Sequence, residues 1–275
     1  MSITAAEVNK LRKQTGAGMM DCKKALTEAN GDFEAAIEIL RKKGQKVAAK
    51  RSDREAGEGA ILSGVNAAGN TGVVISLNCE TDFVAKNDTF GEFCNQVAKT
   101  LVEEPDADFE AMRTAQITKV GENIQIGRKE TLEVEGSGLV AAYIHTGAKV
   151  GVLAEVGATK DDTVHHESFK SLVKDITLQI AAANPSAVSR EQVDPALVAK
   201  EKEIAAEQFK DKPAQAVEKI VEGKMEKFYQ GICLVDQGFV KNGELTVKEH
   251  LAAVGKEIGD ELSIRRFLRF QVGEG

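Results

Sequence analysis

The chain has 275 residues, of which 42% are apolar and 29% charged, a composition typical of a soluble globular protein with two or three structural units. The net charge of −7 argues against a general nucleic-acid-binding protein, and no segment approaches the roughly 18 continuous apolar residues of a membrane-spanning helix. Four scattered cysteines and the lack of a visible secretory signal predict a cytoplasmic protein with reduced thiols, without membrane or direct nucleic-acid partners.

Three helices are predicted at the N-terminus. Thr4 and Glu7 have the spacing of a capping box and begin the first helix. The second helix runs over about 19–29, and Asp32 can cap the third. We expect a compact three-helix module, followed over 44–58 by a basic, solvated linker. A phosphate-binding strip is the alternative interpretation of that linker.

The first two helices are joined by a distinctive segment. Residues 11–26 contain the pattern Leu-Arg-x-x-Thr-Gly-Ala-Gly-Met-Met-Asp-x-Lys-Lys-Ala-Leu. Leu11, Ala25 and Leu26 are expected in the core, and the two glycines in the turn. Met19 and Met20 are candidates for contact with a partner, although methionine is equally suited to filling a core. Both interpretations of the two methionines stay open.

A longer segment of the chain occurs twice. Residues 57–98 can be laid without a gap on residues 136–177, so that Gly57 falls on Gly136 and Phe90 on Phe169. Each copy is predicted to be an antiparallel hairpin followed by a helix and closed by a third strand. The expected turns lie at 67–70 and 146–149, the helices at about 88–103 and 164–183, and the third strands at 125–134 and 264–272.

These elements predict an α+β protein. The fold class is an N-terminal three-helix module followed by two repeated subdomains, each an antiparallel sheet with helices on it. The expected units are 1–55 for the module and linker, 56–135 for subdomain one and 136–275 for subdomain two. Subdomain two is interrupted by a helical insertion at 184–231, in which Pro195 and Pro213 punctuate two antiparallel helices.

The repeat serves as an internal control, because features present in only one copy are better candidates for function than shared ones. Residues 78–86 connect strand to helix in copy one and contain Asn-Cys-Glu-Thr-Asp-Phe-Val-Ala-Lys. The corresponding residues of copy two are polar and contain no aromatic side chain. Phe83 is therefore an apolar ring in a loop where the sister copy has none.

Segments 11–26 and 78–86 closely resemble two signatures of the elongation factor Ts family, with Ser76 where that family usually has an acidic residue. The run that begins at His145 is also similar. The resemblance implies a guanine-nucleotide exchange factor whose Asp82–Phe83 loop inserts near the Mg²⁺ and nucleotide site of the GTPase elongation factor Tu. It also implies that the three-helix module, which resembles a ubiquitin-associated domain, supplies anchorage. The candidate partner-binding residues are Asn78, Thr81, Asp82, Phe83, Val84, Ala85, Lys86, Met19, Met20 and His145.

The resemblance further implies that the insertion is an antiparallel coiled coil that can mediate self-association. A hairpin that buries its apolar stripe only against itself is the alternative. The alternative is slightly favoured because the first helix has a poor stripe of Leu197, Glu201, Ile204 and Gln208.

The sequence contains no signature of an enzyme. It has no phosphate-binding G-x-x-x-x-G-K-[ST] loop and no G-x-S-x-G nucleophile elbow. His165 and His166 have no cysteine or carboxylate at metal-ligand spacing. We therefore expect no catalytic residue, cofactor or metal. The competing functional hypotheses are a non-catalytic adaptor or chaperone-like protein that uses the three-helix module, and an enzyme without a recognised motif.

Overall fold

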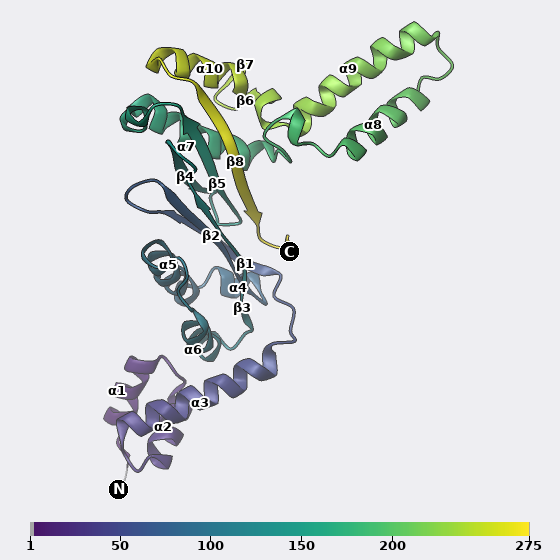
Figure 1. Ribbon diagram of the computed structural model, residues 1–275. Helices are drawn as coiled ribbons and strands as arrows, with labels where there is room; N and C mark the ends of the chain where they lie inside the picture. The colour runs from purple at the N-terminus through teal and green to yellow at the C-terminus, as the bar shows by residue number, and fades with distance from the viewer. Residues whose placement is uncertain (1–2, 275) are drawn as a thin grey trace.

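The computed structural model describes residues 3–274, which form a mixed α/β protein with small antiparallel sheets (Figure 1). The N-terminal helices are α1 (Ala5–Thr15), α2 (Met19–Glu28) and α3 (Phe33–Arg51). Their shared core contains Leu11, Leu26 and Leu40. The expected caps are present: Thr4 and Glu7 form a capping box, and the Asp32 carboxylate accepts from two backbone N–H groups of α3.

The prediction of a linker over 44–58 is wrong for its first half, because α3 continues through Gly44 to Arg51. Gly44 lies against α6 (Glu110–Val120), where a Cβ atom would come within 2.7 Å of Thr118 Oγ1. Four residues later, Ala48 is buried in the core of the first sheet. The helix is therefore held by tertiary contacts that its own apolar pattern does not show.

Two three-stranded antiparallel sheets form the centre of the molecule. The first has the order β1–β2–β3 and the second β4–β5–β8, so each predicted hairpin is joined by a third strand. The strands are β1 (Glu58–Val65), β2 (Thr71–Cys79), β3 (Ile124–Glu133), β4 (Gly138–Ile144), β5 (Val150–Ala158) and β8 (Leu262–Gln271).

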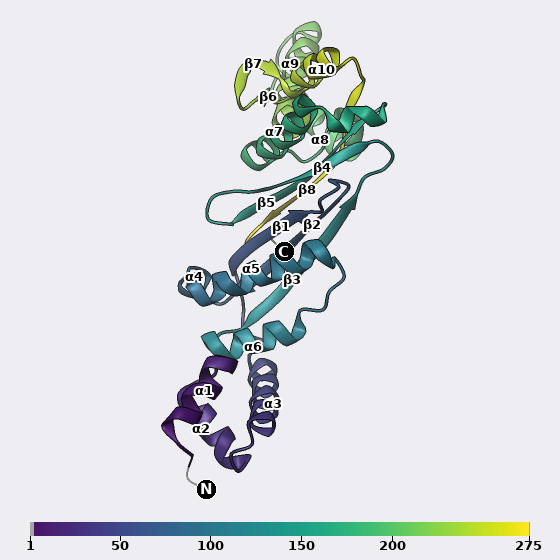
Figure 2. The ribbon, with the colours of Figure 1, turned by 90° about the vertical axis from the view of Figure 1, so that its left-hand side faces the viewer.

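The two sheets pack face to face through a shared apolar cluster that includes Ile61, Leu153 and Phe270. Gly72 and Gly151 permit this close approach, since a Cβ on either would come within 2.6 Å of a side chain of the opposite sheet. Helices cover the outer faces, with α5 (Asp88–Glu103) and α6 on the first sheet and α7 (Glu167–Ala183) and α10 (Val247–Ile258) on the second (Figure 2).

The structural equivalence of the two copies extends beyond the aligned segments. Within those segments, Phe90 and Phe169 are both fully buried, and each central strand has a register shift in its second half. Helices α6 and α10, which the sequence did not reveal, also correspond: each ends at a left-handed glycine, Gly121 or Gly259, just before the third strand.

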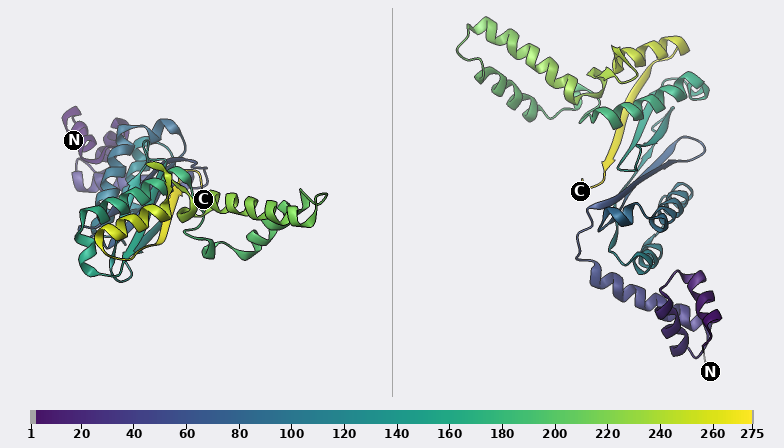
Figure 3. Two further views of the ribbon diagram at one scale, coloured as in Figure 1. Left: turned by 90° about the horizontal axis from the view of Figure 1, so that it is seen from above. Right: turned by 180° about the vertical axis from the view of Figure 1, so that it is seen from behind.

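The segment predicted as an insertion contains α8 (Pro195–Glu207) and α9 (Ala214–Ile232), which project from the far end of the molecule relative to α1–α3 (Figures 1 and 3). Ala205 and Met225 are buried where the two helices meet, whereas Leu197 and Ile204 are exposed. A short hairpin, β6 (Gly238–Phe239) and β7 (Asn242–Thr246), follows before α10.

Candidate functional site

The strand-to-helix connection of copy one forms a single helical turn, α4 (Asp82–Ala85), rather than an irregular loop. Thr81 caps the turn, because its side chain accepts from the N–H of Val84. Val84 and Ala85 pack against the core of the first sheet. Phe83 points away from that core and is 82% exposed, the most exposed of the large apolar side chains that the structure describes. The ring contributes little to the packing of the turn and is accessible to another molecule.

The turn is held from behind by the loop that precedes β3. Glu122 accepts two hydrogen bonds from Thr81, one from the N–H at 3.0 Å and one from the hydroxyl at 2.7 Å. Glu80 accepts the N–H of Asn123 at 2.6 Å. Sequence reasoning did not select Glu122, which lies far from α4 along the chain.

Asp82 and Lys86 form an ion pair across the same turn. Lys86 Nζ lies 2.7 Å from Asp82 Oδ2, and both side chains are well exposed. The hydrogen bond and charge of Lys86 hold the pKa of Asp82 below its usual range, and Asp82 in turn raises the pKa of Lys86. Such an exposed pair is easily exchanged for a contact with a partner, because it stabilises the fold only weakly.

The turn between β4 and β5 lies beside α4. The N–H of Ile61 on β1 donates to the carbonyl of Ala148 at 2.7 Å, and Lys149 pairs with Glu58 at 2.5 Å. Together, α4, α5, β1 and this turn line a half-open cleft of about 560 Å³ with Lys86 and Lys149 among its lining residues. His145 begins the turn and is exposed, with Nδ1 3.2 Å from the hydroxyl of Tyr143.

The remaining sequence candidates lie elsewhere. Met19 and Met20 are exposed, by 48% and 63%, at the start of α2 in the N-terminal module. Asn78 lies on the opposite face of β2 from the buried Leu77 and Cys79, because side chains alternate along a strand, and so faces away from α5. The structure therefore groups Asp82, Phe83 and Lys86 on one turn, across the cleft from the turn that His145 begins, and separates the methionines and Asn78 from them.

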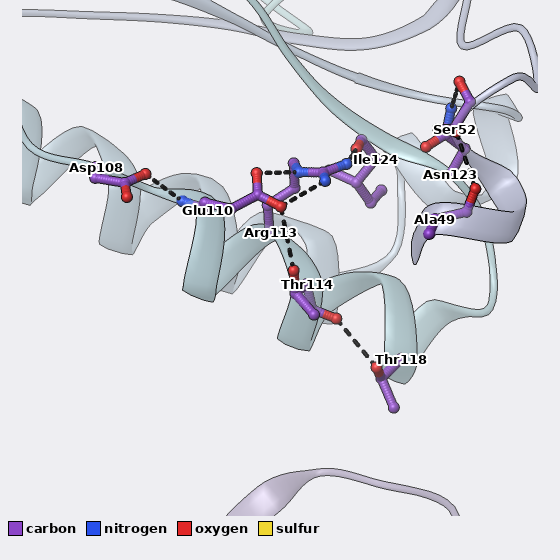
Figure 4. A network of polar contacts seen from close by, with 9 residues as sticks. All are labelled: Ala49, Ser52, Asp108, Glu110, Arg113, Thr114, Thr118, Asn123 and Ile124. Carbon is purple, nitrogen blue, oxygen red and sulfur yellow. Dashed lines mark hydrogen bonds and ion pairs between the residues drawn. The ribbon is translucent and has the colours of Figure 1, made fainter. Parts of the chain in front are cut away.

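The start of β3 has polar contacts with α6 on one side and, through Asn123, with the residues that follow α3 on the other (Figure 4). Arg113 forms a two-point ion pair with Glu110 and donates to the carbonyl of Ile124 at 2.8 Å. On the other side, Asn123 is fully buried and donates to the carbonyl of Arg54, just beyond α3, at 2.7 Å. These contacts fix the loop before β3 between α3 and α4.

Residues 3–274 contain no cluster of three or more histidine, cysteine, aspartate or glutamate side chains suited to a metal ion. The four cysteines are free and buried, and burial raises the pKa of Cys79 to about 11 and that of Cys94 to about 12, so these two thiols stay protonated. Within the same residues, no helix is both long and apolar enough to cross a bilayer.

Comparison with known proteins gives a consistent result. A family described as "Elongation factor TS" matches residues 80–274. A protein of Trichlorobacter lovleyi named "Elongation factor Ts" is 42% identical, with 100% of this chain and 94% of the relative covered. A protein of the same name from Syntrophotalea carbinolica is 44% identical with the same coverage, and one from Clostridium perfringens is 43% identical over 99% of this chain and 94% of the relative.

Proposed function

The chain belongs to the elongation factor Ts family of translation elongation factors, and we propose that it is the guanine-nucleotide exchange factor for elongation factor Tu. In this role it speeds the release of GDP and so allows GTP to be loaded during elongation. It acts by binding and carries out no chemical reaction of its own.

The physical requirement for exchange is a difference in affinity. A protein that binds the nucleotide-free GTPase more tightly than the GDP-bound form must weaken GDP binding by the same factor. The contacts that matter are therefore those made only when the nucleotide site has opened. Tight binding to both forms would hold the partner without releasing its nucleotide.

The exposure of Phe83 is the observation that carries the proposal. Its ring is 82% exposed on a turn whose other apolar side chains, Val84 and Ala85, anchor it to the core. In our proposal the ring wedges between side chains near the partner's Mg²⁺ site and displaces the backbone that orients the metal and phosphates. Asp82 exchanges its ion pair with Lys86 for a polar contact at the same site.

Other surfaces supply anchorage in this proposal. Met19 and Met20 on α2 contact a second part of the GTPase, and His145 beside α4 contacts a third. The units 1–55, 56–135 and 136–275 stay predictions. Each contributes most of one apolar cluster, while Ala48 of the first unit packs into the cluster of the second and the two sheets share a further cluster. The coiled-coil character of α8 and α9, their self-association and a cytoplasmic location stay predictions.

The test measures release of fluorescent GDP from purified elongation factor Tu, with unlabelled GDP in excess, in the presence and absence of the folded protein. We expect acceleration that increases with the concentration of the protein. The chain alone should bind neither GDP nor GTP by calorimetry, because it lacks a phosphate-binding loop. An unchanged release rate at saturating protein would refute the proposed function and favour the adaptor hypothesis.

A further inference from the structure

Both copies of the repeat contain a carboxylate at the same structural position. Glu122 and Asp260 each follow a left-handed glycine and lie two residues before the third strand. Glu122 accepts the N–H of Thr81, and Asp260 accepts the N–H of Lys160, the residue that corresponds to Thr81 in copy two. Each carboxylate also accepts from threonine hydroxyls, Thr81 in copy one and Thr159 and Thr163 in copy two.

The two carboxylates hold turns with different surfaces. Asp260 holds a short 3₁₀ turn (Asp161–His165), in which the counterpart of Phe83 is the exposed Asp162. Glu122 holds α4, in which the same position carries the exposed ring. The same device therefore supports a polar turn in one copy and the proposed wedge in the other.

The connection from Glu122 to the ring is short. Both donors of Thr81 are directed at Glu122, and the Thr81 hydroxyl oxygen is also the acceptor that caps α4, 3.3 Å from the N–H of Val84. A four-residue helix cannot sustain itself, because a single turn fixes several backbone dihedrals for one hydrogen bond. The cap therefore adds to the packing of Val84 and Ala85 in holding α4, and Glu122 fixes the Thr81 side chain that forms this cap.

The two residues that follow Glu122 are held by three hydrogen bonds. Asn123 donates to Glu80 through its N–H and to the carbonyl of Arg54 through its side chain. Arg113 donates to the carbonyl of Ile124 (Figure 4). A carboxylate on a loop held in this way can transmit orientation to the turn in front of it, whereas one on a mobile loop could not.

We propose that Glu122 is a positioning residue for nucleotide exchange, which presets the turn bearing Phe83 for insertion into the GTPase. The inference rests on the proposed function. A preset turn enters the partner without first being ordered, and without Glu122 the cost of ordering it would reduce the binding energy available to open the nucleotide site.

The test compares Glu122→Ala with Asp260→Ala, which removes the equivalent carboxylate of the other copy. Fluorescent GDP release is measured at equal concentrations of folded protein, with thermal melting recorded for each variant. Glu122→Ala should slow stimulated release about ten-fold, the effect expected from losing one or two hydrogen bonds that order the turn. Asp260→Ala should lower the melting temperature yet preserve release per folded molecule, and Glu122→Gln, which keeps one acceptor oxygen, should give an intermediate rate.

A double-mutant cycle with Phe83→Ala separates positioning from general stability. If Glu122 acts through the ring, Glu122→Ala should slow release little further once Phe83 is alanine, whereas independent effects would multiply. Multiplying effects, or equal losses of exchange in the Glu122 and Asp260 variants, would overturn the inference. If the alanine variants do not fold, Glu122→Gln and Asp260→Asn make the same comparison. An inactive wild-type protein would refute the proposed function instead, and an active wild type with a fully active Glu122→Ala would refute only the positioning role.

Discussion

Replacing Phe83 with alanine removes the ring from α4 while leaving the turn and its cap in place. Because the ring is 82% exposed, its loss should change the free energy of unfolding by less than about 0.5 kcal/mol, as is usual for surface substitutions. Truncation of a buried aromatic such as Phe90, which is 1% exposed, should instead cost about 3–5 kcal/mol. The melting temperature therefore distinguishes a surface role from a core role.

The effect on exchange follows from the same exposure. A phenylalanine side chain presents roughly 200 Å², so about 160 Å² of the ring is in contact with water. Burying that area in the partner is worth at most about 4 kcal/mol at about 25 cal/mol per Å². If alanine retains roughly a quarter of this, about 3 kcal/mol is lost, which corresponds to a decrease of about 100-fold in the rate of stimulated release.

The assay is fluorescent GDP release at equal concentrations of folded protein. Val240→Ala is the matched control, since Val240 is an exposed apolar residue outside the candidate site, 49% accessible, and its loss should leave release unchanged. Combining Phe83→Ala with Asp82→Ala should slow release less than the product of the single effects, because both residues act at one site. A Phe83→Ala protein that melts well below wild type yet exchanges normally per folded molecule would refute the wedge.

Three further predictions test other parts of the structure. Gly44→Val should lower the free energy of unfolding by about 1–3 kcal/mol in chemical denaturation, because the valine side chain would collide with Thr118 on α6. The control is Gly223→Val on α9, where an added Cβ meets no neighbouring atom, and this variant should be tolerated. Replacing residues 200–224 with a short glycine–serine linker should leave exchange largely intact. The ion pair between Arg190 and Asp236 at the base of the hairpin is retained, so the core should stay folded. Loss of most of the release rate with the core folded would show that the insertion participates. The free energy of unfolding should fall as the pH drops below about 6.5, since burial against Phe239 lowers the pKa of His250 and the unfolded chain then binds the proton more readily. Denaturation titrations of His250→Phe should lack this component, and an unchanged pH profile would contradict the assignment.

The elements that could be predicted from the sequence are those with local signals. Caps located α1 and α3, the repeat located both hairpins, and the third strands were predicted outside the repeat as separate segments. The continuation of α3 could not be predicted, because glycine at position 44 normally weakens a helix and its benefit depends on α6. Helix α6 also escaped detection, since its buried positions include the polar Thr114 and Gln116, which leave no apolar period in the sequence.

In the candidate site, too, one residue could be predicted from the sequence and another could not. Phe83 was found by comparing the two copies, because an aromatic side chain present in only one of them is visible in the sequence alone. Glu122 was missed because its partner, Thr81, lies 41 positions earlier in the chain. No motif of the sequence marks this glutamate among the many other acidic residues. A signal did exist: 121–124 contains Gly-Glu-Asn-Ile and 259–262 contains Gly-Asp-Glu-Leu, so a glycine–carboxylate pair precedes the third strand in both copies.

The duplicated architecture explains how an exposed aromatic ring can be accommodated at low cost to stability. Each copy holds its strand-to-helix turn through the residue before it, Thr81 or Lys160, and a carboxylate from the loop before the third strand. The fold therefore depends on backbone groups and that carboxylate, and not on the outward side chain of the turn. That position is free to differ, as aspartate in one copy and phenylalanine in the other, because neither side chain packs into a core. The backbone and the carboxylate therefore stabilise the turn, whereas its outward side chain is free to contact a partner. Substitution of Phe83 should accordingly change the rate of GDP release, and substitution of Asp260 should change the melting temperature.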